Sequence, residues 1–248
     1  MPRGRAECGD GTMSTDILVW IGLAVFAGTF IQGSTGMGFA LIVAPVLGFL
    51  KPELLPGGLL LMMLPLNAYV AWREWRSLDR RGVAWITGGR AAGTFGGLAV
   101  LLALPPSALN IMIGATTILA AVATLAMPSF APKKSAFLSA GVFTGITETA
   151  TGIGGPPLAL VYQHMPAATL RSSVALCFLL GEIISIVVLA ISGRIDSSTF
   201  GTVAWALPAI VVGLVASQAV YHRVNARFLR IAVLAFAIVS GVFILVHH

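Results

Sequence analysis

The chain has 248 residues, of which 57% are hydrophobic and only 10% are charged, and its net charge is +6. A soluble domain carries roughly 25% charged residues, so this composition excludes an ordinary soluble globular protein. Apolar runs of about 17 to 25 residues, the length that crosses a bilayer, recur along the chain. The sequence therefore predicts an all-α fold, a polytopic transmembrane helical bundle. The basic residues cluster between the apolar runs, where the positive-inside bias explains them without a nucleic-acid partner.

The predicted spans follow a polar N-terminal tail, residues 1–15, which we expect to be disordered. In chain order the apolar runs cover 17–50, 54–72, 84–104, 107–127, 136–164, 171–192, 199–221 and 228–246. Six of them have the length of a single span. A straight helix over 17–50 would instead measure about 51 Å, against a hydrocarbon core of about 30 Å. We therefore expect the first and fifth runs to be broken near their middle.

Each long run contains a glycine-rich segment, and the two segments match at an offset of 116 residues. The first includes Gln32, Ser34, Thr35, Gly36, Gly38 and Phe39, and the second includes Glu148, Thr149, Thr151, Gly152, Gly154, Gly155 and Pro156. The later runs repeat at the same offset. The chain is thus predicted to form two membrane repeats, residues 16–127 and 135–248, joined by a linker at 128–134. Matched interrupted helices in two halves are typical of secondary transporters and indicate where the substrate binds.

The topology depends on whether the broken runs cross the membrane. If all eight runs cross, both repeats point the same way, with nine Lys and Arg residues inside and five outside. If the broken runs are re-entrant hairpins, the second repeat is inverted, with ten basic residues inside and four outside. The positive-inside bias favours the inverted arrangement.

The two breaks are the predicted substrate site. Glycine tolerates positive φ and close backbone approach, which suits a sharp break. The half-helices that follow, 38–50 and 156–164, would begin inside the membrane with free N–H groups and a partial positive charge that attract an anion. Hydroxyl groups beside the breaks would add donors, from Ser34, Thr35, Thr149 and Thr151. In the alternative interpretation the glycines only allow helices to pack closely.

Four other polar residues within the runs are candidates for a proton-coupling or polar network. Glu148 is either a proton carrier or a structural carboxylate that bonds the broken backbone, and its counterpart Gln32 cannot titrate. Arg90 could pair with an anion or a carboxylate, but lies near enough to the run's start that snorkelling to the inner interface is favoured. Glu182 lies mid-run. At the offset of 116 residues it matches the neighbour of Asn67, so we expect the two side chains at similar depth.

The residues give no support to an enzyme. Gly33–Gly38 loosely resembles a dinucleotide-binding loop but lacks a preceding strand and a following acidic residue. The mid-chain histidines, His164 and His222, stand at run ends rather than beside a serine at depth. No Cys, His and carboxylate cluster has metal-ligand spacing. We therefore expect no catalytic residue, no metal and no cofactor.

Three segments carry a family resemblance. Residues 33–39 (Gly-x-Thr-Gly-Met-Gly-Phe) followed by Pro45, residues 151–157 (Thr-Gly-Ile-Gly-Gly-Pro-Pro), and Arg171 opening the next span resemble the sulfite exporter TauE/SafE family of membrane permeases. The resemblance extends over about residues 16–246. It implies a multi-pass plasma-membrane carrier for small anions such as sulfite, sulfonates or sulfoacetate. Phe39-Ala40 departs from the family pattern and predicts that the second break contacts more of the substrate.

The predicted function is secondary transport of a small anion by alternating access, with proton coupling through Glu148 as a further hypothesis. A passive anion channel would use the same broken helices without counterflow. A non-transporting membrane scaffold would use the glycines for packing alone. The expected partners are the anion, the lipid bilayer and a second copy in a homodimer, and the expected location is the inner or plasma membrane of the cell.

Overall fold

The computed structural model describes residues 15–105, 132–163 and 165–220, with scattered positions between 108 and 122 and between 235 and 242. Every regular element in these ranges is helical, which confirms the predicted fold class. The helices are α1 (Thr15–Thr35), α2 (Phe39–Leu50), the 3-10 turn η1 (Pro52–Leu54), α3 (Gly57–Arg73), the 3-10 turn η2 (Trp75–Ser77), α4 (Arg80–Ala103), α6 (Lys134–Thr151), α7 (Gly155–Tyr162), α8 (Ala167–Ile191) and α9 (Ser197–Val220). The predicted run at 228–246, most of that at 107–127, and most of the predicted tail and linker lie outside the described residues.

Four of the described helices are long and apolar enough to cross a membrane, namely α1, α4, α8 and α9. By contrast, α2 has 12 residues and α7 has 8. At 1.5 Å per residue these helices measure about 18 Å and about 12 Å, well short of a hydrocarbon core of about 30 Å. The two short helices are the segments that follow the predicted breaks, so the breaks lie where the glycines indicated.

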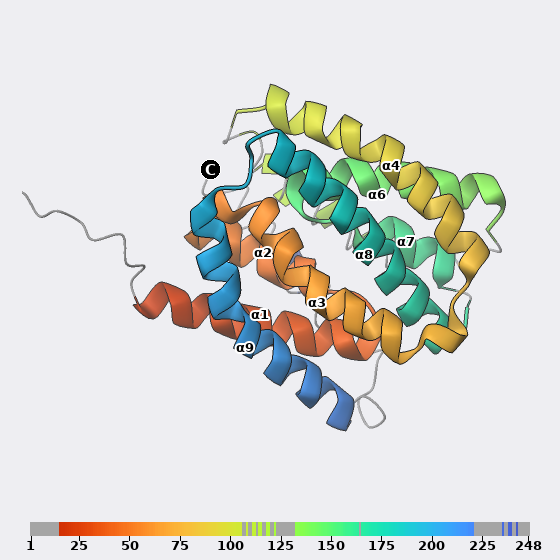
Figure 1. The fold of residues 1–248 in the computed structure, drawn as a ribbon, viewed down its shortest axis with the longest axis horizontal. Coiled ribbons are helices and arrows are strands. Elements are labelled where there is room, and N and C mark those ends of the chain that lie inside the picture. Colours follow the sequence, from red (N-terminus) through yellow and green to blue (C-terminus); the bar gives the residue numbers. More distant parts are fainter. Residues whose placement is uncertain are drawn as a thin grey trace, which may run out of the picture.

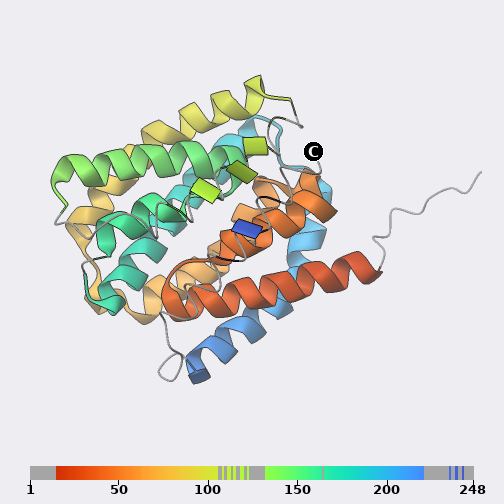
Figure 2. The ribbon, with the colours of Figure 1, turned by 180° about the vertical axis from the view of Figure 1, so that it is seen from behind.

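The chain turns back on itself at each break. A Cβ added to Gly28 of α1 would lie 3.0 Å from the Val43 side chain of α2. Similarly, the Thr144 hydroxyl of α6 donates to the Gly154 carbonyl just before α7, over 3.1 Å. Each broken run is therefore a helical hairpin, and α1 and α6 both lie on the near side of the molecule in Figure 2.

Helices α3 and α8 form an antiparallel pair across the middle of the view in Figure 1. Gly57, at the start of α3, packs against Ile195, just beyond the end of α8. Halfway along, Asn67 bonds Glu182. At the far end, Glu74 bonds Arg171 near the start of α8. The two helices that match in the predicted repeats, α3 and α8, therefore run in opposite directions.

Glycines bring two further helix pairs into close contact. A Cβ at Gly145 of α6 would lie 2.7 Å from the Arg90 carbonyl oxygen of α4, and one at Gly93 would overlap the carbonyl oxygen of Val142. In the pair α1 and α9, a Cβ at Gly213 would lie 2.9 Å from the Phe26 carbonyl oxygen. Small residues permit such backbone approach between membrane helices. The first helix of each predicted repeat thus packs along a helix of the other repeat.

Candidate functional site

At the first break, α1 ends in a glycine turn that its own side chains hold in place. Gly36 and Gly38 have φ values of 90° and 123°, a region that favours glycine. The Thr35 hydroxyl donates to the Ile31 carbonyl at 3.0 Å and to the Met37 carbonyl at 2.7 Å. The amide N–H of Phe39, the first residue of α2, donates to Oε1 of Gln32 at 3.0 Å.

The second break repeats much of this geometry. Gly152 has a φ of 80°, and its N–H donates to the Glu148 carbonyl at 2.7 Å. The Thr151 hydroxyl donates one turn back, to the Thr147 carbonyl, and accepts the N–H of Ile153 at 3.2 Å. One contact differs between the breaks. Gln32 bonds the broken backbone, whereas the matching carboxylate of Glu148 turns away to a cation.

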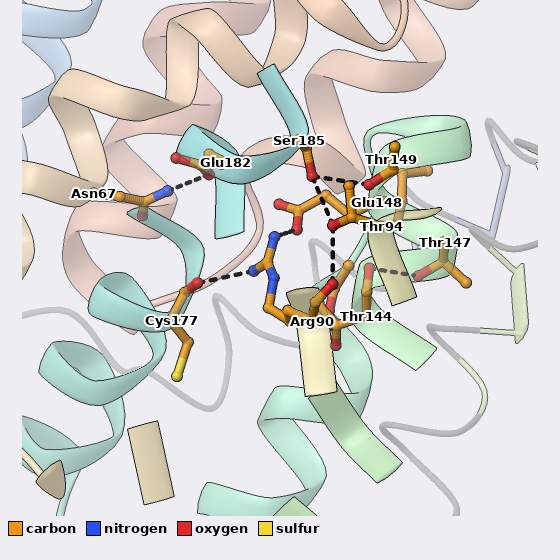
Figure 3. A network of polar contacts seen from close by, with 12 residues as sticks. Asn67, Arg90, Thr94, Thr144, Thr147, Glu148, Thr149, Cys177, Glu182 and Ser185 are labelled. Atoms are coloured by element: carbon orange, nitrogen blue, oxygen red, sulfur yellow. Dashed lines mark hydrogen bonds and ion pairs between the residues drawn. The ribbon is translucent and has the colours of Figure 1, made fainter. Parts of the chain in front are cut away.

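That cation is Arg90, whose side chain is 0% exposed in the middle of α4. Its guanidinium forms an ion pair with Glu148 and donates to the Cys177 carbonyl of α8 at 3.0 Å (Figure 3). It lies 5.6 Å from the ring centroid of Phe178 and packs directly against Gly181, where a Cβ would overlap it. The favoured interpretation of snorkelling to the interface is wrong, because glycine spacing, a carboxylate and a carbonyl accommodate the charge inside.

A second set of polar side chains connects the first break to α8. Gln32 Nε2 donates to Asn67 Oδ1 at 2.7 Å, and Asn67 Nδ2 donates to Glu182 Oε1 at 2.7 Å. All three side chains are at most 2% exposed. Glu182 and Asn67, expected at similar depth, are therefore in direct contact, and Figure 3 shows their bond beside the Arg90 ion pair.

Hydroxyl groups line the other side of the ion pair. Thr94 donates to the Arg90 carbonyl at 2.9 Å, and Ser185 lies 3.4 Å from the Thr94 hydroxyl and 2.8 Å from the Thr149 hydroxyl. Thr94 and Ser185 were not among the predicted site residues. Their only signal in the sequence is a helical spacing from charged residues, four positions after Arg90 and three after Glu182.

The structure does not bring the two breaks into one site. Gly36 packs against Arg171 near the start of α8, and Gly152 packs against Leu59 near the start of α3. Since α3 and α8 are antiparallel, the breaks lie toward opposite ends of this pair. The predicted site residues between them are those of the polar cluster, which we define as Gln32, Asn67, Arg90, Glu148 and Glu182. Of the other predicted residues, Ser34, Thr35 and Thr151 donate their hydroxyls to carbonyls four residues earlier.

The polar cluster holds one cation and two carboxyl groups, and some of their polar atoms have no hydrogen-bond partner among the described residues. Arg90 Nε, Glu148 Oε1 and Glu182 Oε2 are buried without a hydrogen-bond partner among the described residues. Buried polar atoms are costly unless paired, so atoms of this kind indicate a place for a ligand, a proton or water. The cluster is therefore a candidate site for a small polar species and for proton exchange. No group of His, Cys, Asp and Glu able to hold a metal occurs in the described parts of the chain.

Comparison with known proteins decides the family. The sequence model described as "Sulfite exporter TauE/SafE" matches residues 20–244 of the chain. The chain belongs to the TauE/SafE family. A relative from Cupriavidus necator, described as "Probable sulfite/organosulfonate exporter TauE", is 27% identical over 197 residues, which cover 75% of this chain and 77% of the relative. No solved structure matches the chain. This TauE/SafE protein is thus a membrane protein of a transporter family, as its apolar helices also indicate.

Proposed function

We propose that this TauE/SafE protein exports a small sulfur-containing anion, sulfite or an organosulfonate, across the cell membrane by alternating access. The observation that carries the proposal is the fully buried Arg90 at the centre of the polar cluster. A charged side chain inside a membrane bundle is costly, and such residues usually mark the path of a substrate or ion. The relative named as a sulfite/organosulfonate exporter supports the choice of anion.

Arg90 has the chemistry to recognise a sulfite or sulfonate group. A guanidinium presents five N–H donors in a plane and keeps its charge at any physiological pH. The bonds to Glu148 and Cys177 occupy two of its nitrogens, while the N–H at Nε has no partner among the described residues. A sulfonate oxygen can accept from such a donor, and the hydroxyls of Thr94, Thr149 and Ser185 are near the same ion pair.

Inverted repeats supply the proposed means of alternating access. The antiparallel α3 and α8 occupy matching positions in the predicted repeats, and the two breaks lie toward opposite ends of them. In such an architecture, the two repeats can exchange conformations, so that the cluster opens first to one face and then to the other. The re-entrant placement of both hairpins in the bilayer is part of this proposal.

Counterflow in proteoliposomes tests the proposed function. Vesicles that contain the full chain are loaded with unlabelled methanesulfonate and diluted into labelled methanesulfonate. A carrier gives saturable, transient accumulation of label, whereas a channel gives equilibration without accumulation. Absence of flux for methanesulfonate, sulfite and sulfoacetate alike, in well-folded protein, would overturn the transporter assignment and favour the scaffold.

Two variants connect the flux to Arg90. The double variant Arg90→Met with Glu148→Met removes the ion pair without leaving a lone buried charge, so we expect it to fold. We expect its counterflow to be lost. The control is Arg194→Met, which removes the same charge from an exposed position between α8 and α9 and should leave counterflow intact. Full counterflow in the folded double variant would exclude Arg90 as the anion-binding group.

A further inference from the structure

The hydrogen bonds from the first break to Glu182 have a fixed direction. A backbone N–H only donates, so the bond from Phe39 requires Gln32 to present its carbonyl oxygen there. The Gln32 amide nitrogen must then donate to Asn67 Oδ1, and Asn67 in turn donates to Glu182 Oε1. The chain of donors ends at that oxygen. Glu182 Oε1 is therefore an acceptor, and a proton on this carboxyl group belongs on Oε2.

The charge balance of the cluster requires such a proton. Arg90 is paired with Glu148, while the hydrogen bond of Glu182 within the described residues comes from the neutral amide of Asn67. With both carboxylates ionised, this fully buried cluster would carry one uncompensated negative charge. When two buried carboxylates share one cation, one of them tends to become neutral instead. Its Oε2 atom, which has no partner in the described part of the chain, is where the proton would bind.

Among the residues that the structure describes, the groups around Glu182 offer no second cation. From α4 it faces Arg90, from α6 the Glu148 partner of Arg90, and from α3 the neutral Asn67. On its own helix the titratable neighbour is Cys177, which is buried. On α7, Tyr162 lies near Cys177 and Asp79. Arg73 and Arg171 both contact Glu74, at the far end of α3.

We propose that Glu182 is the proton-binding residue of the transport cycle, and that it carries one proton on Oε2 with each anion bound beside Arg90. This rests on the proposed function and differs from the hypothesis that Glu148 is the proton carrier, since Glu148 is held as the counter-ion of Arg90. When Glu182 is protonated, the empty cluster is neutral, and Oε2–H can donate a hydrogen bond to the anion. When Glu182 is ionised, the anion meets an additional negative charge.

Linkage makes this relation reciprocal. Protonation of Glu182 raises the affinity for the anion, and anion binding raises the affinity for the proton by the same factor. One proton enters from water with a monovalent anion and leaves with it on the other side. Proton and anion together add no net charge, so the loaded cluster carries the same net charge as the empty cluster with Glu182 ionised.

Proton uptake on anion binding tests this proposal with wild-type protein. Purified full-length chain in weakly buffered detergent solution is mixed with methanesulfonate, which takes up no proton itself, and a pH-indicator dye reports the change. We expect up to one proton taken up per anion bound. We also expect the apparent Kd to rise about tenfold for each pH unit above the titration of Glu182. Anion binding with no proton uptake at any pH and a constant Kd would overturn the proposal while leaving the anion site itself in place.

Two matched substitutions identify the carboxyl group. Glu182→Gln fixes the neutral form, so the ratio of counterflow rates at acid and alkaline pH should fall to about one. Glu148→Gln should keep the dependence of counterflow on pH. The reverse result, with pH dependence lost only in Glu148→Gln, would assign the proton to Glu148 and overturn our proposal. If Glu182→Gln does not fold, the infrared band of a protonated carboxyl group decides, measured in wild type and in the double variant Arg90→Met with Glu148→Met. The band should remain when the ion pair is removed, and its loss would give the same contrary answer. Absence of methanesulfonate counterflow in wild type would instead contradict the proposed function.

Discussion

At the scale of single residues, Arg90 depends on the absence of a side chain at position 181. A Cβ added to Gly181 would overlap the guanidinium, which lies across the α8 backbone to reach the Cys177 carbonyl. The guanidinium cannot move away without weakening its bonds to Glu148 and Cys177. The glycine is therefore part of what fixes the cation in position.

We expect Gly181→Ala to lower the free energy of unfolding by about 1–3 kcal/mol, because overpacking a filled interior has this cost. Thermal unfolding in detergent measures the change. The control is Gly201→Ala in α9, where a Cβ would meet no atom within 4 Å. There the helix propensity of alanine should leave stability unchanged or raise it by up to about 1 kcal/mol. Equal effects of the two substitutions would show that the contact with Arg90 carries no energy.

Prediction from the sequence was uneven at this scale. The repeat register predicted that Asn67 and Glu182 lie at similar depth, and they share a hydrogen bond. The position of Arg90 was mispredicted, because its burial depends on Glu148, on Gly181 and on a carbonyl of α8, all far away in the sequence. The register also matched Gln32 with Glu148, but equal positions do not imply equal partners. One side chain bonds backbone and the other a guanidinium.

At the scale of helices, the contact between α4 and α6 depends on glycines along one face. Gly89, Gly93 and Gly97 of α4 each approach α6 so closely that a Cβ would meet its backbone. Prediction from the sequence concerned the glycines of the two breaks, for which close helix packing was the alternative interpretation, and did not extend to these glycines of α4. Both roles of glycine occur in the structure. Gly36, Gly38 and Gly152 adopt positive φ at the breaks, while the α4 glycines are helical and allow close packing.

We expect Gly93→Ala to destabilise the protein by about 1–3 kcal/mol, since backbone atoms of Val142 cannot move aside as a side chain can. The matched control on the same helix is Gly88→Ala, where a Cβ would have open space within 4 Å. Thermal unfolding of the two variants compares a packed with an unpacked face of α4. A control that is as unstable as Gly93→Ala would mean that helix packing is not the cause.

At the scale of the whole molecule, an ion pair between Glu74 and Arg171 joins two helices. It connects the end of α3, in the predicted first repeat, to the start of α8. Arg171 Nε lies 3.0 Å and 3.1 Å from the two Glu74 oxygens, and its Nη2 lies 2.6 Å from Oε1. Arg73 also contacts Glu74 and donates to the Gly33 carbonyl of α1 at 3.1 Å. Three helices are thereby held together at one end of the molecule, beside Gly36.

We expect Glu74→Gln to increase the reactivity of the buried Cys177 toward a thiol reagent. Hydrogen bonds to charged groups contribute about 1.5–3 kcal/mol, so opening between α3 and α8 should become about ten- to a hundredfold more frequent. Labelling is measured in a Cys8→Ser background, which leaves Cys177 as the single cysteine. The control is Glu53→Gln, which removes a partly exposed ion pair with Lys51 and should change nothing. Unchanged labelling in Glu74→Gln would contradict this role for the ion pair.

The packing of α1 on α9 has a consequence for biosynthesis. About 160 residues separate Thr35, the end of α1, from Ser197, the start of α9. At about 5–20 residues per second, a ribosome completes α1 on the order of ten to thirty seconds before its partner begins to emerge. During the first part of this interval Asn67, the hydrogen-bond partner of Gln32, has not been synthesised. The carboxyl group of Glu182, which accepts from Asn67, is made later still. The newly inserted first hairpin therefore enters the bilayer with unmet polar groups, and the nascent chain should depend on insertion factors until α8 and α9 arrive.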